Sequence, residues 1–221
     1  MEFTLDTTQA TGLETACLVI GAFEDAPLHE SAEMVDKASS GALQQLIKSG
    51  DVSTDWKDTT LLHGLDGVNA KRILVLGCGE IEKFNTLRYD SVCSSAGVFL
   101  RGHATTSAHI CLNEIEVSKT TNHWRLRQAA VNLERANYRY TATKAPKDDD
   151  HQPLQNASFN GGPDLQHALD EAAGIARGYV RSMELGNLPP NICNPQYLAE
   201  IAQEFAENYK NVSAEILDED Q

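Results

Sequence analysis

The chain has 221 residues, of which 41% are hydrophobic, and it carries a formal net charge of −14. This is enough apolar material for one large domain or two small ones, and it excludes a wholly disordered chain. Apolar runs are only a few residues long, so we expect no segment that spans a bilayer. Because the first residues lack the basic start and apolar stretch of a signal peptide, we expect a cytoplasmic protein.

The charge is distributed unevenly along the sequence. Residues 1–70 carry 3 basic and 12 acidic groups (net −9), residues 71–147 carry 12 and 6 (net +6), and residues 148–221 carry 3 and 14 (net −11). The overall negative sign opposes binding to a nucleic acid, although the basic middle third could form a local patch. We therefore expect no nucleic-acid partner.

The first two thirds of the sequence alternate between strand-like and helical patterns. Three short apolar runs predict buried strands: residues 17–23, 72–76 and 108–115. Apolar residues at helical spacing predict helices over residues 29–49, 85–100 and 124–138. Ser39–Gly41 is expected to break the first of them. Strands that alternate with helices predict an α/β sandwich around a largely parallel or mixed sheet, in a first domain that we place at residues 1–145.

The composition changes near residue 141. Residues 141–162 are polar and rich in proline, aspartate and glycine, and only Leu154, Ala157 and Phe159 suggest a short strand. Such a stretch is typical of a domain edge, so we predict a linker over residues 146–162.

Two helices and a strand are predicted after this linker. A long helix covers residues 163–186, with a proline in its first turn and Gly186 at its end. Asn194 is a good N-cap for a second helix, and the alternating residues 212–217 predict a strand. This tail has little chain of its own to cover its apolar faces. It therefore packs on the first domain or opens a second, incomplete domain, which we place at residues 187–221.

The sequence contains no recognisable catalytic or metal-binding motif. There is no G-x-S-x-G or S-x-x-K serine motif, no H-E-x-x-H and no C-x-x-C pair. Seven histidines are spread over the chain: His29, His63, His103, His109, His123, His151 and His167. Five scattered cysteines are expected to be small buried residues of a reducing compartment: Cys17, Cys78, Cys93, Cys111 and Cys193. We assign no catalytic residue, no cofactor-binding residue and no metal ligand to this chain.

Two short segments suggest ligand binding only weakly. Gly77–Gly79 follows a predicted strand, as a dinucleotide-binding loop does, but Glu82 stands where the third glycine of that motif would be. A tight turn at the strand end explains it better, and binding of a nucleotide or ADP-ribose there is an alternative. The acidic triplet Asp148–Asp150 has no neighbouring ligands and is expected to be solvated.

The predicted helix 124–138 and the residue after it carry four arginines at positions 125, 127, 135 and 139, which do not form one continuous stripe. The simplest interpretation is a solvated face. An interface with an acidic patch of another subunit is the first alternative, and contact with a nucleic acid is the weakest.

Residues Met183–Ala199 form an unusual arrangement, in which a helix is followed by a double proline between two asparagines and then by a capped helix. This segment strongly resembles the leucyl aminopeptidase (cytosol aminopeptidase) family of two-metal exopeptidases, bacterial type. Five earlier segments are similar to this family as well: Met1–Phe3, Ala16–Gly21, Leu61–His63, Arg72–Gly79 and Trp124–Ala129.

The resemblance implies a macro-domain-like N-terminal α/β domain, a long connecting helix and the first helix and strand of an incomplete peptidase domain. It also implies a cytoplasmic homohexamer with a pair of divalent metals, manganese or zinc, in the full-length parent. The family's ligand segments, Phe-Asp-Ser-Gly-Gly and Asn-Thr-Asp-Ala-Glu-Gly-Arg, do not occur here. We therefore expect an N-terminal fragment that is inactive alone, holds no cofactor and serves in structure and oligomer assembly.

Overall fold

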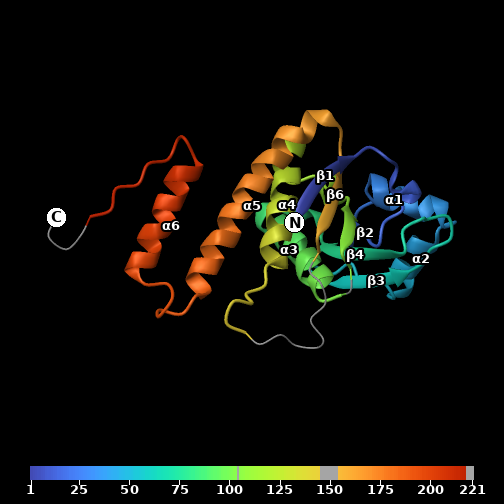
Figure 1. Cartoon of the computed structure of the whole chain (residues 1–221). Helices are drawn as coiled ribbons and strands as arrows, with labels where there is room; N and C mark the ends of the chain where they lie inside the picture. Colours follow the sequence, from blue (N-terminus) through green and yellow to red (C-terminus); the bar gives the residue numbers. More distant parts are fainter. Residues whose placement is uncertain (104, 145–153, 218–221) are drawn as a thin grey trace. The chain divides into compact units, whose positions relative to one another are not determined.

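The computed structural model describes residues 1–103, 105–144 and 154–217 (Figure 1). The chain divides into two compact units. The first comprises Met1–Arg139 and Lys147–Val180, and the second comprises Tyr140–Pro146 and Arg181–Gln221. Each unit is described by itself.

A sheet of six strands forms the centre of the first unit, in the order β1-β6-β5-β2-β4-β3. Its strands are β1 (Glu2–Asp6), β2 (Leu18–Phe23), β3 (Thr59–His63), β4 (Arg72–Gly79), β5 (Ser107–Ile110) and β6 (Asn156–Asn160). β3 pairs antiparallel with β4, and the other neighbours are parallel. The structure confirms the predicted α/β fold with a mixed sheet.

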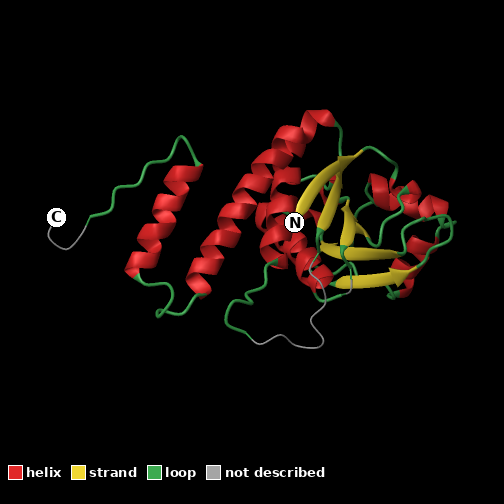
Figure 2. Ribbon diagram, viewed as in Figure 1, coloured by secondary structure: helices red, strands yellow, loops and turns green. Residues whose placement is uncertain are grey.

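Helices cover both faces of this sheet (Figure 2). The helices of the chain are α1 (Glu30–Ala38), α2 (Ala42–Ser49), α3 (Thr86–Arg101), α4 (Asn122–Asn137), α5 (Gln166–Asn187) and α6 (Pro195–Asn208). Because side chains alternate across a strand, β2 sends Val19 to the core under α3, α4 and α5, and it sends Leu18 and Ile20 to the core under α1 and α2. Strands buried on both faces explain the continuous apolar runs in the sequence.

The helix boundaries follow from residues visible in the sequence. The predicted break at Ser39–Gly41 is confirmed between α1 and α2, where Gly41 has φ = 86°. Gly50, with φ = 84°, ends α2. The side chain of Asn85 accepts hydrogen bonds from the backbone N–H groups of Leu87 and Arg88 and so begins α3.

Three parts of the sheet differ from the sequence-based prediction. β1 was not predicted. β5 ends at Ile110, and a 3₁₀ turn over Leu112–Glu114 replaces the rest of the predicted strand. β4 continues through Gly79 instead of turning at Gly77, because Gly77 and Gly79 exchange backbone hydrogen bonds with the segment around Asp58 and Thr54.

The range 146–162, predicted as a linker, contains β6. This strand lies between β1 and β5 and pairs with both, so residues 156–160 belong to the sheet. Ala157 and Phe159 are fully buried, as the sequence suggested for a short strand. Residues 145–153, with the acidic triplet Asp148–Asp150 and His151, lie outside the described residues.

The second unit contains the end of α5 and α6. Asn194 caps α6 by accepting the N–H of Tyr197 at 2.9 Å, as predicted. The predicted strand at residues 212–217 is wrong. A strand requires a neighbouring strand to complete its hydrogen bonds, and no described segment pairs with these residues. Among the described residues, no helix combines the length and apolar character needed to cross a membrane.

Candidate functional site

The Gly77–Gly79 segment is closed to ligands. The N–H of Gly77 donates to the carbonyl of Asp58 at 2.9 Å, and the N–H of Gly79 donates to the carbonyl of Thr54 at 2.9 Å. A Cβ atom at Gly77 would lie 1.9 Å from the carbonyl oxygen of Asp55. The backbone donors that a phosphate would need are therefore already used, and there is no room above them.

The arginines of α4 are engaged with the protein. Arg125 Nε donates to the carbonyl of Asn113 at 3.0 Å, and Arg127 donates to the carboxylate of Glu171 at 2.9 Å. The Arg135 guanidinium lies 5.8 Å from the centre of the Tyr179 ring. These contacts use the charges inside the first unit, which disfavours a basic surface for nucleic acid.

A polar pocket of about 330 Å³ lies at the carboxyl ends of β1 and β6. Asp6 and Asn160 end these strands, and Ser31 of α1, Asn113 and Glu114 are among the other residues that line the pocket. Parallel strands point their carboxyl ends to one edge, so side chains distant in sequence meet here. Small molecules commonly bind at this edge in α/β proteins.

A hydrogen-bond network organises this pocket. The backbone N–H and the hydroxyl of Ser31 donate to the two oxygens of Glu114 at 3.0 and 2.7 Å. Asn160 Nδ2 donates to the Ser31 hydroxyl at 3.0 Å and also to Glu114. Burial raises the pKa of Glu114, and the hydrogen bonds from Ser31 and Asn160 oppose that shift. Asn113 is 1% exposed, and its side-chain oxygen has no hydrogen-bond partner.

His109 lies behind this network and is completely buried. Its Nε2 bonds to the side-chain oxygen of Asn160, so Nδ1 accepts the Ser158 hydroxyl at 2.8 Å. Burial lowers the pKa of His109, and the hydrogen bond to Asn160 opposes the shift. A neutral histidine in this position fixes Asn160 rather than reaching a ligand.

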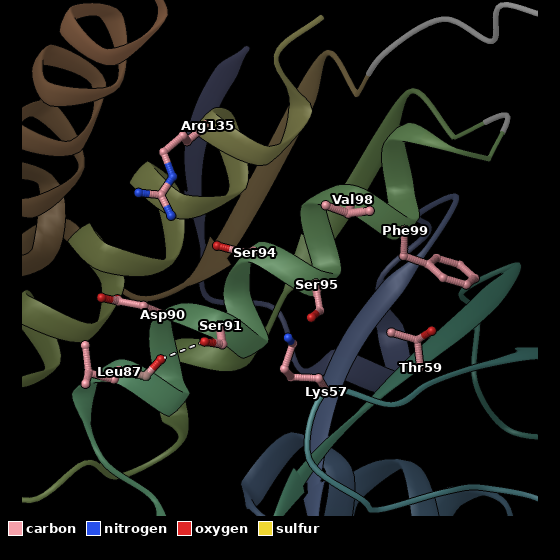
Figure 3. Close-up of a pocket in the computed structure, with 10 residues that line it drawn as sticks. All are labelled: Lys57, Thr59, Leu87, Asp90, Ser91, Ser94, Ser95, Val98, Phe99 and Arg135. Atoms are coloured by element: carbon pink, nitrogen blue, oxygen red, sulfur yellow. Dashed lines mark hydrogen bonds between the residues drawn. The ribbon is translucent and has the colours of Figure 1, made fainter. Parts of the chain in front are cut away.

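A second, larger pocket of about 780 Å³ runs along α3 and is open to solvent (Figure 3). Leu87 and Val98 are 75% and 51% exposed there. The Ser91 hydroxyl donates to the carbonyl of Leu87 in its own helix, so it is not activated as a nucleophile. Burial raises the pKa of Asp90, and the Asn132 amide, which donates to it at 2.9 Å, opposes the shift. This pocket suits contact with another polypeptide better than chemistry.

One cluster of candidate metal ligands occurs among the described residues: His123, His167 and Glu171. His123 is in the first turn of α4, and the other two are in α5. His123 Nε2 lies 3.3 Å from His167 Nδ1, which lies 3.5 Å from Glu171 Oε1. The Arg127 hydrogen bond lowers the pKa of Glu171.

This cluster does not fit the metal pair implied by the family resemblance. Two metals about 3.5–4 Å apart need several carboxylates that converge on one place. The cluster supplies a single carboxylate, and no other group of three such ligands is found in the described part of the chain. No catalytic step through a metal pair is therefore derived for these residues.

Four of the five cysteines are buried structural groups. Cys17, Cys78, Cys93 and Cys111 are buried, and Cys193 is half-buried. Burial raises the pKa of Cys17 to about 11 and that of Cys78 to about 12. The prediction that these residues act as small buried groups is confirmed for those four.

The fold of the chain matches that of two solved enzymes. A mutant of tomato leucine aminopeptidase matches with a TM-score of 0.77 and 19% identity, over 100% of this chain and 45% of that chain. The bottromycin maturation enzyme BotP, solved in complex with Mn, matches with a TM-score of 0.66 and 15% identity, over 88% of this chain and 36% of that one.

Sequence comparisons give the family. Residues 19–147 match the description "Cytosol aminopeptidase family, N-terminal domain". The chain belongs to the cytosol aminopeptidase family. Its full length is 41% identical to a probable cytosol aminopeptidase of Stenotrophomonas maltophilia and 39% identical to one of Xanthomonas axonopodis pv. citri. It covers 44% and 45% of these proteins, so the chain spans less than half the length of the curated relatives it matches.

Sequence reasoning missed both the polar pocket and the histidine cluster. The pocket depends on β1 and on the position of β6 in the sheet, and neither was predicted. One signal for the cluster was present, because His167 and Glu171 are four residues apart on a predicted helix and so share a face. Nothing in the sequence brings His123 to them.

Proposed function

We propose that this chain is the N-terminal part of a leucyl aminopeptidase-like exopeptidase, which uses two divalent metals, manganese or zinc, to remove N-terminal residues from peptides. The match of residues 19–147 to the N-terminal domain of the family carries this proposal. We place the N-terminal domain at residues 1–145, the connecting helix at 163–186 and the start of the catalytic domain at 187–221. The segment 146–162 joins the first two and also contributes β6 to the sheet of the N-terminal domain. The complete enzyme works in the cytoplasm.

The role of the chain itself is structural. It supports assembly of a homo-oligomer, a hexamer as in the family, and the apolar residues exposed along α3 are its candidate contact surface. The carboxylate-poor histidine cluster supports the absence of peptidase activity in this chain alone, because it does not suit a metal pair.

A peptidase assay tests the first part of the proposal. The purified chain is incubated with leucine p-nitroanilide and Mn²⁺, beside the full-length Stenotrophomonas maltophilia relative as a positive control. We expect turnover by the control and none above background by the chain. Turnover by the chain that a chelator abolishes would contradict the proposed structural role.

Light scattering after gel filtration tests the assembly role. We expect a mass that is a multiple of the 24.2 kDa of one chain. Introducing a charge into the α3 surface by Val98→Glu should reduce that mass, while Glu82→Lys, outside this surface, should not. A wild-type chain that elutes as a monomer at micromolar concentration would contradict assembly through this domain.

Binding of a small nucleotide-like ligand is a second candidate function. The polar pocket between Ser31, Glu114 and Asn160 favours it, because the buried side-chain oxygen of Asn113 has no partner there. Calorimetry with ADP-ribose provides the test. A heat of binding that Ser31→Ala abolishes supports it, and the absence of heat from the wild-type chain at millimolar ligand removes this candidate.

A further inference from the structure

We propose that His123, His167 and Glu171 form a binding site for a single zinc-like divalent cation, which joins α4 to α5 within the first unit. The site uses two imidazole nitrogens and one carboxylate oxygen. It is independent of the function proposed above, because it needs no residue outside the described part of this chain.

The spacing of the ligand atoms matches the geometry of zinc. In a tetrahedral site with bonds of about 2.0–2.1 Å, ligand atoms lie about 3.3–3.4 Å apart. His123 Nε2 and His167 Nδ1 are separated by 3.3 Å, and His167 Nδ1 and Glu171 Oε1 by 3.5 Å. The ligand atoms of all three residues lie within 4.8 Å of one another. Small side-chain rotations are therefore enough to close the site around one ion.

The backbone holds these ligands in place before any ion binds. His167 and Glu171 are four residues apart in α5 and share one face of that helix. The Thr121 hydroxyl accepts the N–H of Trp124 and fixes the first turn of α4, which contains His123. Buried residues of both helices, including Ala130 and Ala172, belong to the same core. An ion would thus join two helices that border the same core.

Arg127 acts as a supporting residue of the site. It donates to Glu171 Oε2 at 2.9 Å, while Oε1 is the oxygen closer to His167. One oxygen can therefore bind the ion as the other stays with Arg127, in the way that metal-binding carboxylates are usually held by a further hydrogen bond. This arrangement orients the carboxylate but also places a positive charge nearby.

Two electrostatic features weaken the site without removing it. His123 and His167 lie in the first turns of their helices, where the positive end of the helix dipole disfavours a cation. Because the ion carries two charges, each dipole lowers its affinity by about 3–30-fold at an exposed site. Loss of one hydrogen bond that supports a metal ligand changes metal affinity 10–100-fold. The three ligands themselves therefore contribute more to the affinity than the dipoles remove.

The donor set selects the class of ion. Two imidazoles and one carboxylate suit zinc and similar first-row ions, whereas magnesium and calcium prefer oxygen ligands only. Three protein ligands leave the fourth zinc position for water. His167 is 77% exposed, so solvent reaches this position.

Zinc titration of the full chain, in competition with a chromophoric chelator, tests the proposal. We expect one zinc ion per wild-type chain. His123→Asn, His167→Asn and Glu171→Gln should each weaken binding at least tenfold. The matched control is His63→Asn, because His63 is an exposed histidine outside the cluster. The reference chain and all variants carry Cys193→Ser to exclude the half-buried thiol, and circular dichroism verifies their folding.

Cobalt provides a second measurement on the same proteins. Co²⁺ in a tetrahedral site made of two imidazole nitrogens, one carboxylate oxygen and one water absorbs visible light strongly. Its spectrum should appear with wild type and His63→Asn and be lost in the double variant His123→Asn/His167→Asn. The proposal is overturned if wild type binds no zinc at millimolar concentration. It is also overturned if the double variant binds as tightly as wild type.

Discussion

The two units of this chain differ in how their apolar residues are used. In the first unit, both faces of the sheet are covered, and side chains such as Leu74, Phe159 and Val92 are completely buried. In the second unit, Ile201 is the only buried apolar residue among those described, and Leu198 and Tyr209 of the α6 region are 46% and 48% exposed. Both units contain well-formed helices, so helical structure alone says little about stability.

The difference shows where the free energy of folding resides. Burial of apolar surface stabilises the first unit, whereas α6 depends on its cap and on exposed contacts such as the Arg181–Glu204 ion pair at 3.0 Å. An exposed pair of this kind contributes about 0–1 kcal/mol. We therefore expect substitutions in the first unit to change global stability and those in the second to have local effects.

The largest effect is expected for Phe159→Ala in β6. Phe159 is fully buried and packs edge-on against Phe3 at 5.9 Å, so its truncation leaves a cavity between two strands. The loss should be about 3–5 kcal/mol in the free energy of unfolding, measured by urea denaturation. The corresponding change Leu198→Ala in α6 should cost less than about 1 kcal/mol. Equal losses of unfolding free energy for the two variants would show that burial stabilises both units to the same extent.

A smaller loss is expected for Gly77→Ala in β4. The added methyl group would lie 1.9 Å from the Asp55 carbonyl oxygen and must displace the segment around it. Overpacking of this kind costs about 1–3 kcal/mol in unfolding free energy. Gly186→Ala is the control in the second unit, because an added Cβ there would meet no atom within 4 Å other than its chain neighbours and its own helix backbone. Alanine should stabilise this helix by about 0.5–1 kcal/mol.

The third prediction concerns the pH dependence of the first unit. Burial lowers the pKa of His109 below its ordinary value of 6.5, so the folded chain binds this proton less readily than the unfolded chain. The free energy of unfolding is therefore unaffected by His109 well above pH 6.5. It falls as the pH decreases from 6.5 through the pKa of His109 in the folded chain, by at most about 1.4 kcal/mol per pH unit.

The measurement is the unfolding free energy of wild type and His109→Asn between pH 7.5 and 5. Subtracting the two curves removes the opposite contributions of Glu114 and Asp90, whose pKa values are raised by burial. A difference that does not depend on pH would show that His109 is not held neutral.

The smallest effect on global stability is expected for Asn194→Ala. It removes the hydrogen bond from the Tyr197 N–H that begins α6. The helix should lose about 1 kcal/mol of local stability, visible as faster amide exchange at residues 195–198. Urea unfolding of the first unit should be unchanged. If amide exchange in α6 and the urea midpoint of the first unit both shift, α6 stabilises the sheet.

Sequence patterns predicted the elements whose signal is local. The apolar run ending at Phe23, the N-cap Asn194 and the break at Ser39–Gly41 all appear where expected. The patterns failed where a partner distant in sequence decides the structure. β1 is half-exposed and becomes a strand only because β6 pairs with it, while residues 212–217 alternate correctly but have no described partner strand.

The candidate sites were less predictable for the same reason. Glu114 and Ser31 are 83 residues apart, and no local pattern indicates that they bond to each other. His123 and His167 are 44 residues apart, and only the packing of α4 and α5 brings them together. Gly77–Gly79 had a stronger signal for ligand binding in the sequence than either of these sites. In the structure, the backbone of residues 54–58 covers that segment and leaves no room for a ligand.

The pairing of β1 with β6 has a consequence for synthesis on the ribosome. Phe3 meets Ala157 in this ladder, so β1 must wait for β6, which is the last strand of the sheet to be made. At about 5–20 residues per second, the ribosome needs roughly 8–30 s to reach β6. During that interval the nascent amino-terminal segment has no β6 to pair with, and a chaperone has time to bind it.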